Sequence, residues 1–222
     1  MLTVHHLNNS RSQRVLWLLE ELEVEYEIAR YERDPKTMLA PKKLRDIHPL
    51  GKAPVVTDGD HTIAESGAII EYVVDAYGEG RLKPDAGTPE FLKYRYWMHY
   101  AEGSAMSPFL LHVIFDQLPK QAPWAARPLL KMVSKTVNDE YIQGQIELHT
   151  SYWEEELENR PYFAGDDFTA ADIQMSFPLE SAAARGATES DYPNIFAMLD
   201  KLHDRPAYGR ALERGGDYSL AM

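Results

Sequence analysis

Three polar side chains near the start of the chain stand where a helix is expected to begin. Asn9, Ser10 and Ser12 precede a run of apolar residues at helical spacing. Ser10 and Gln13 form a capping-box pattern, in which both side chains satisfy free N–H groups of the first turn. A hydroxyl or amide in this place can also donate to an anion that the helix dipole attracts. The segment therefore predicts either a plain helix cap or an anion site.

A second expected helix start places an acid beside a cap. Ser66 is expected to cap the helix that continues to Tyr77, and Glu65 lies immediately outside it. The N–H groups of the first turn attract a carboxylate, and Glu65 attracts an ammonium group. Together they fit the zwitterionic end of an α-amino acid, although a cap beside a surface acid would give the same pattern.

Composition limits the chemistry. The 222 residues include no cysteine, which removes disulfides, thiolate metal sites and a cysteine nucleophile, so any thiol must come with a ligand. The 23 basic and 35 acidic residues give a net charge of −12, which disfavours nucleic acid as a partner. We find no targeting segment and no apolar stretch of about 18 residues, and therefore expect a cytoplasmic protein without membrane contact.

The pattern around these residues changes once along the chain. Residues 1–80 predict the order βαβ followed by ββα, with Asp58-Gly59-Asp60 as the turn of a hairpin. Residues 81–89 are rich in glycine, proline and charge and predict a linker. Residues 90–222 show long helical patterns and no strong strand pattern. We therefore expect an α/β domain with a mixed four-stranded sheet, followed by an all-α domain.

Four stretches resemble the cytosolic glutathione transferase family: NNSRSQRVLW, HPLGKAPVV, AESGAII and FTAADI. They occur in the family's order and span nearly the whole chain. The last is a capping box of Thr169 and Asp172, which is a folding element. The resemblance implies a thioredoxin-like first domain, glutathione as co-substrate and no metal. The absence of cysteine and of an early tyrosine points to the serine or asparagine types, in a theta-, phi- or nu-like bacterial or fungal branch.

The resemblance also assigns glutathione-binding residues. Pro54 would form a cis peptide bond, so that Val55 offers its backbone N–H and C=O groups to the cysteinyl part. Lys52 would pair with the glycyl carboxylate, and Glu65 with Ser66 would hold the γ-glutamyl group. On sequence alone, Pro54 marks a strand edge or a turn, and Lys52 is equally a solvated surface charge.

The donor to the glutathione sulfur stays open among three residues. Ser10 is the leading candidate because it is the best N-cap, and Asn9 and Ser12 are the alternatives. Lowering a thiol pKa from about 8.5 by roughly two units needs about 2.7 kcal/mol. A hydrogen bond to the anion, about 1.5 to 3 kcal/mol, and a helix-terminus field of about 0.3 to 1 kcal/mol can supply this.

The second substrate is expected between the domains. Residues 94–111 are rich in aromatic and methionine side chains, which favours an apolar pocket with Tyr100, Met106 and Phe109 as lining candidates. The resemblance implies a homodimer that conjugates glutathione to apolar electrophiles in detoxification. Peroxide or disulfide reduction by the same site stays open. The alternatives are a non-catalytic protein-interaction scaffold and a glutathione-dependent isomerase or dehalogenase of the same fold.

Overall fold

The computed structural model describes residues 1–34, 37, 39–216 and 218–220. Its one sheet within these residues has the order β2-β1-β3-β4, with β1 parallel to β2 and antiparallel to β3, which is antiparallel to β4. The strands are β1 (Leu2–Leu7), β2 (Tyr26–Tyr31), β3 (Val55–Asp58) and β4 (His61–Ala64). Gly59, at φ 55°, provides the left-handed backbone of the β3–β4 turn. The expected mixed four-stranded sheet and its hairpin are confirmed.

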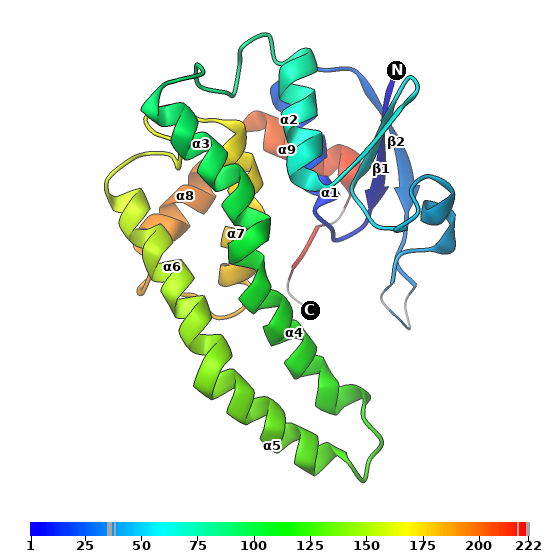
Figure 1. Cartoon of the computed structure of the whole chain (residues 1–222), viewed down its shortest axis with the longest axis vertical. Coiled ribbons are helices and arrows are strands. Elements are labelled where there is room, and N and C mark those ends of the chain that lie inside the picture. The colour runs from blue at the N-terminus through cyan, green and yellow to red at the C-terminus, as the bar shows by residue number, and fades with distance from the viewer. Residues whose placement is uncertain (35–36, 38, 217, 221–222) are drawn as a thin grey trace.

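Two helices and a 3₁₀ turn complete the first part of the chain: α1 (Ser12–Glu21), η1 (Lys42–Asp46) and α2 (Ser66–Tyr77). The sheet and helices α1 and α2 lie together on one side of the molecule (Figure 1). The described elements from residue 89 onward are helical: α3 (Pro89–Tyr100), η2 (Ala101–Ala105), α4 (Met106–Gln121), α5 (Arg127–Val137), η3 (Asn138–Ile142), α6 (Gln143–Glu158), α7 (Ala170–Ala183), α8 (Pro193–His203) and α9 (Pro206–Gly215). The thioredoxin-like and all-α classes are therefore confirmed, and the exact domain boundaries stay a prediction.

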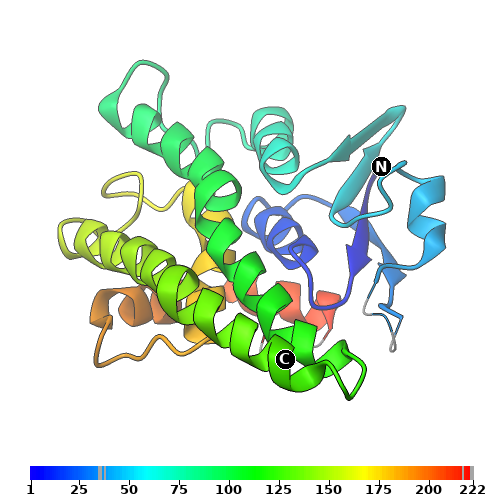
Figure 2. The ribbon, with the colours of Figure 1, turned by 60° about the horizontal axis from the view of Figure 1, so that its bottom comes forward.

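Helix α1 lies between the sheet and the helical part (Figure 2). Trp17 is buried and packs against Phe168 and edge-on against Tyr208 of α9. Arg205 and Glu21 form an ion pair of 2.6 Å across the same contact. Because apolar packing and ion pairing both join the two parts, the start of α1 is held in place relative to the helices.

Three expected local features differ in the structure. The helical pattern near the end of residues 90–222 is divided into α8 and α9, because Pro206 has no N–H to continue α8 and instead begins α9. The N-cap of α1 is Arg11, whose side chain makes no capping hydrogen bond, so the cap expected at Ser10 is wrong. The N-cap of α2 is Glu65, so the cap expected at Ser66 is also wrong.

Candidate active site

The hydroxyl of Ser10 is used within the protein. Ser10 is only 5% exposed, and its Oγ donates to the carbonyl of Leu7 at 2.7 Å. The same oxygen lies 2.7 Å from the Oγ of Ser12 and accepts from the Ser12 N–H at 3.2 Å. Neither described cavity beside this turn has Ser10 in its lining. Ser10, the leading sequence candidate, therefore supports the loop and lines neither of these cavities.

Ser12 is fully buried in the same network. Its Oγ accepts from the Leu7 N–H at 3.2 Å and lies 2.9 Å from Nδ1 of His6. Burial and the nearby Arg30 lower the pKa of His6 to about 4, although a hydrogen bond to the Gly215 backbone opposes them. His6 is therefore neutral near pH 7. Ser12 connects β1 to the start of α1.

Asn9 is the candidate that lies beside a cavity. Its backbone is left-handed, at φ 47°, a conformation that asparagine tolerates better than most residues. Arg33 donates to its carbonyl at 3.2 Å, and the backbone N–H of Ser219 donates to its Oδ1 at 2.9 Å. Asn9 lines a cavity of about 570 Å³. Of the three residues considered as hydrogen-bond donors to the glutathione sulfur, only Asn9 lines this cavity.

A smaller cavity, of about 200 Å³, lies at the start of α2. Glu65 is exposed and has the unusual φ of 73°, and Ser66 is the first residue of the helix. The N–H groups of this first turn have no partner within the helix. An acid and free amides thus meet at one cavity, as an α-amino acid end requires. Its lining is Arg11, His48, Leu50, Lys52, Ala53, Pro54, Ala64, Glu65, Ser66 and Glu102.

The expected cis peptide bond is present between Ala53 and Pro54. Val55, however, is fully buried in β3, where it pairs with His5 of β1 and Ala64 of β4. It does not line the cavity, whereas Ala53 does. The expectation that Val55 offers its backbone groups to a ligand is therefore wrong, because Val55 already pairs with both neighbouring strands of the sheet.

Two of the three residues named as acceptor-pocket candidates line the larger cavity. Met106 and Phe109 line it together with Leu110, Val113 and Phe177. Tyr100 does not line it, because its hydroxyl lies in the helical core, accepting from Nε1 of Trp153 at 3.0 Å and bonding to Nδ1 of His149. The expectation for Tyr100 is therefore wrong.

Three charged side chains line both cavities: Arg11, Lys52 and Glu102. Nε of Arg11 donates to both oxygens of Glu102 at 2.9 Å, and the Arg11 guanidinium lies 4.5 Å from the ring centre of Phe177. Glu102 also pairs with Arg14, which is buried. Burial raises the pKa of Glu102, but Arg14 and Arg11 outweigh this effect and hold the pKa below its ordinary value. Glu102 is therefore ionised, and it ties the start of α1 to η2.

Known proteins resemble this chain in sequence and fold. Family models for the N-terminal and C-terminal domains of glutathione S-transferase match residues 1–75 and 126–208. The chain is 36% identical to glutathione S-transferase 3 of Schizosaccharomyces pombe, over all of this chain and 91% of that protein. It is 31% identical to glutathione S-transferase 1 of Saccharomyces cerevisiae, over 96% of this chain and 95% of that protein.

The chain belongs to the glutathione S-transferase family. A solved glutathione S-transferase from Actinobacillus pleuropneumoniae is 34% identical and superposes with a TM-score of 0.81, covering 97% of this chain and 93% of that one. By its enzymatic class, the present chain is a glutathione transferase.

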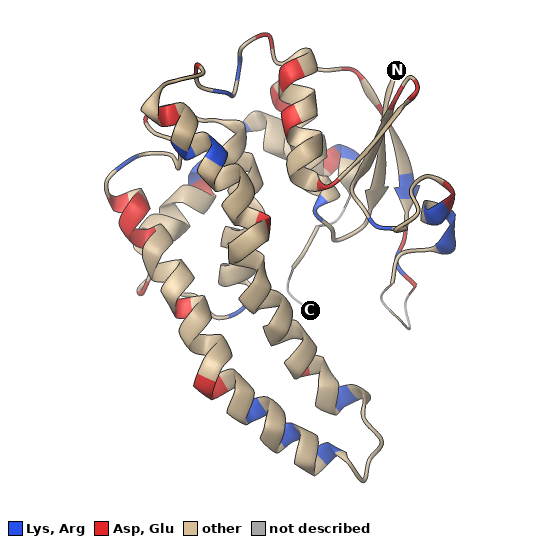
Figure 3. Cartoon of the chain, in the orientation of Figure 1, with Lys and Arg blue, Asp and Glu red and all other residues tan. Residues whose placement is uncertain are grey.

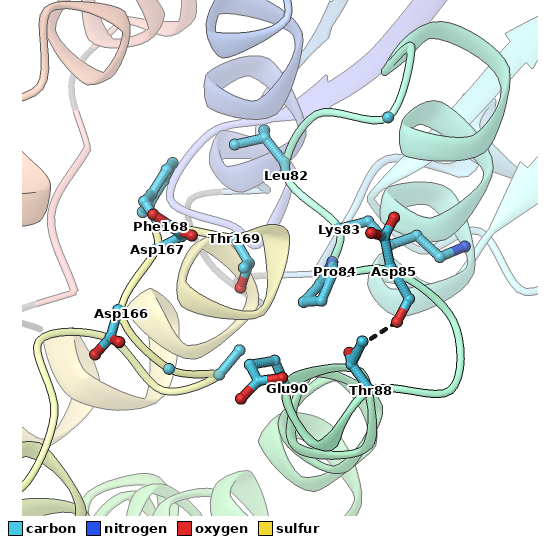
Figure 4. Close-up of a pocket in the computed structure, with 13 residues that line it drawn as sticks. Leu82, Lys83, Pro84, Asp85, Thr88, Glu90, Asp166, Asp167, Phe168 and Thr169 are labelled. Atoms are coloured by element: carbon cyan, nitrogen blue, oxygen red, sulfur yellow. Dashed lines mark hydrogen bonds between the residues drawn. The ribbon is translucent and has the colours of Figure 1, made fainter.

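Another cavity, of about 600 Å³, has none of the predicted glutathione residues in its lining. Figure 4 shows the residues that line it. The cavity lies between residues 80–90 and the loop before α7. Four carboxylates line it, those of Asp85, Glu90, Asp166 and Asp167. Within the described part of the chain, no group of three or more His, Cys, Asp or Glu residues is placed to hold a metal ion. None of the described helices is both long and apolar enough to cross a membrane.

Sequence reasoning missed four residues that line the two cavities: Arg11, Glu102, Ser219 and Ala53. Arg11 lies within the expected helix start, and Ala53 directly precedes the expected cis proline. Both residues therefore lie inside motifs from which they could have been predicted. Glu102 and Ser219 lie 91 and 210 residues from their partners Arg11 and Asn9. No local pattern reports such distant contacts.

Proposed function

We propose that this transferase binds glutathione in the smaller cavity and conjugates its sulfur to an apolar electrophile in the larger one. The observation that carries the proposal is the shared lining of Arg11, Lys52 and Glu102. A ligand that starts at α2 therefore has a path to the space lined by Asn9, Met106 and Phe109. The apolar side chains of that space favour an acceptor with an apolar body.

Glutathione would bind through complementary charge. Its γ-glutamyl carboxylate would meet the N–H groups at Ser66, and its ammonium group would meet Glu65. Lys52, which is exposed at the junction, would pair with the glycyl carboxylate. Ala53 would take over the main-chain contact with the cysteinyl part that was expected of Val55, because Ala53 lines the cavity.

The Nδ2 group of Asn9 would donate to the glutathione sulfur and favour its thiolate. A hydrogen bond to an anion contributes about 1.5 to 3 kcal/mol, and each pKa unit of the thiol corresponds to about 1.4 kcal/mol. One such donor therefore accounts for roughly one to two units. Catalysis would consist of stabilising the anion and positioning it, without a covalent intermediate on the protein.

We also propose a C2 homodimer that acts in the cytoplasm, where thiols are kept reduced. Helices α4 and α5 extend from the body as a pair (Figure 1), and their exposed apolar side chains support an interface. These are Leu110, Ile114, Leu118, Leu129, Met132 and Val133. Basic positions gather toward the far end of this pair and acidic ones on α2, which gives two copies complementary surfaces (Figure 3). Replacing Ile114 and Leu118 together by Glu is expected to yield monomers in sedimentation velocity.

The direct test of the function is conjugation kinetics across a panel of apolar electrophiles, with glutathione binding measured by calorimetry. We expect saturable binding and conjugation with several electrophiles. Glutathione binding without turnover of any electrophile would contradict the conjugation proposal, and absence of both would favour a non-catalytic scaffold. A Phe109→Ala variant should raise the KM for the electrophile while leaving the Kd for glutathione within about twofold.

A further inference from the structure

We propose that the segment Tyr218–Leu220 acts as a positioning element that fixes the orientation of the Asn9 side chain, so that its Nδ2 group faces the glutathione sulfur. This inference rests on the proposed function, since it assumes that Asn9 is the sulfur donor. It adds a specific role for a segment 210 residues away in the sequence.

The hydrogen bond from Ser219 assigns the two ends of the Asn9 amide. A backbone N–H can only donate, so the atom that it meets at 2.9 Å is the acceptor Oδ1. The Nδ2 group, which carries two donor hydrogens, is then left on the other side of the amide. No hydrogen bond among the described residues uses it. Because Asn9 lines the larger cavity, this donor is free to meet a ligand there.

The backbone of Asn9 is held independently of this segment. Arg33 donates from Nη2 to the Asn9 carbonyl at 3.2 Å and from Nε to the Asn8 carbonyl at 3.2 Å. The Arg33 backbone N–H also donates to Oδ1 of Asn8 at 2.9 Å. The remaining freedom of Asn9 is therefore rotation of its side chain, and Ser219 restricts that rotation.

The segment is itself anchored beside the cavity. The hydroxyl of Tyr218 donates to Glu180 of α7 at 2.6 Å, and burial beside that carboxylate raises the pKa of Tyr218. Tyr208 donates to the other oxygen of Glu180 at 3.1 Å. Ser219 and Leu220 line the same cavity as Asn9. One segment thus forms a wall of the acceptor space and orients the donor.

The test compares two substitutions at Ser219. Ser219→Pro removes the N–H, whereas Ser219→Ala keeps it and changes only the side chain. The readout is the pKa of the glutathione thiol bound to the full-length protein, followed by thiolate absorbance against pH. Ser219→Pro is expected to raise this pKa by about one unit and to lower the conjugation rate about tenfold below that pKa. Ser219→Ala is expected to keep the bound thiol pKa of the parent.

A second variant separates loss of the Ser219 N–H from a general disturbance of the segment. Tyr218→Phe removes the anchor to Glu180 but keeps the Ser219 N–H, so the thiol pKa should rise less than in Ser219→Pro. Equal thiol pKa values in Ser219→Pro, Tyr218→Phe and the parent would overturn the inference. An unchanged pKa in Asn9→Ala would instead overturn the proposed function. A raised pKa in Asn9→Ala together with no change in Ser219→Pro would overturn the positioning role alone.

Discussion

The starts of α1 and α2 look alike in sequence but do different work in the structure. Both have a serine beside the first helical turn, at Ser10 and at Ser66. At α1 the hydroxyls of Ser10 and Ser12 bond to each other and to the main chain of Leu7. At α2 the first turn opens into a cavity, with Glu65 beside it.

A helix start can bind a ligand only where its polar groups are not already used by hydrogen bonds within the protein. β1 leads into α1 through a tight turn, and the serine hydroxyls form hydrogen bonds within that turn. The residue of this turn that lines the cavity is the preceding one, Asn9, which is half-buried and has a left-handed backbone. Substitutions of Ser10 or Ser12 should therefore affect stability, and substitutions of Glu65 should affect binding.

The largest effect on the unfolding free energy is expected at Glu102 of η2, which pairs with Arg11 and Arg14 at the start of α1. Glu102→Gln would leave the buried Arg14 without its counter-charge, and breaking such a pair costs about 3 kcal/mol or more. Chemical denaturation should report this loss. The matched control is Asp139→Asn, which breaks the exposed pair with Lys135 and should leave the unfolding free energy unchanged. Equal effects of the two substitutions would contradict the support assigned to Glu102.

The next effect depends on pH and comes from His6 beneath the same turn. Its folded pKa of about 4 lies below the unfolded value of 6.5. The unfolded chain therefore gains a proton first as the pH falls, so stability is full above pH 6.5 and decreases toward pH 4, by up to about 3 kcal/mol.

Unfolding free energies between pH 4 and 7 check this expectation. The curve of His6→Gln should be flatter than that of the parent over this window, and the exposed His99→Gln is the matched control. A parent curve with the same slope as that of His6→Gln would exclude His6 as the source.

Ser12→Ala tests the internal role of the α1 hydroxyls. It removes the acceptor of the Leu7 N–H in a fully buried place, which is expected to cost about 1 to 3 kcal/mol of unfolding free energy. The Kd for glutathione should stay within about twofold. Ser104→Ala, at an exposed position, provides the control. A large change in Kd without loss of stability would reverse the roles of the two helix starts.

The smallest effect is expected at α2 and concerns binding. Glu65→Gln should raise the Kd for glutathione about tenfold, or about 1.4 kcal/mol, because the ammonium group loses its carboxylate partner. Its unfolding free energy should change by less than about 0.5 kcal/mol, since the side chain is exposed. Calorimetry measures the Kd, and Asp60→Asn in the β3–β4 turn is the control. An unchanged Kd in Glu65→Gln would remove Glu65 from the binding site.

Local patterns predicted the fold better than they predicted the site. The capping box of Thr169 and Asp172 was predictable because its partners lie three residues apart, and the structure confirms it. Alternating apolar residues and the Asp58-Gly59 turn likewise predicted the hairpin. The choice between Asn9 and Ser10 was not predictable, because it depends on the turn after β1 and on Ser219. The place of Tyr100 depends on packing against Trp153, which is 53 residues away.

In the proposed function, Asn9, and not Ser10, donates to the glutathione sulfur. The most direct test of this assignment is the pKa of the bound glutathione thiol in the parent, Asn9→Ala and Ser10→Ala proteins, with stability measured in parallel. Asn9→Ala is expected to raise this pKa by about one to two units. Ser10→Ala is predicted to lower the unfolding free energy while the thiol pKa stays at the parent value. A raised thiol pKa in Ser10→Ala together with an unchanged one in Asn9→Ala would contradict the assignment.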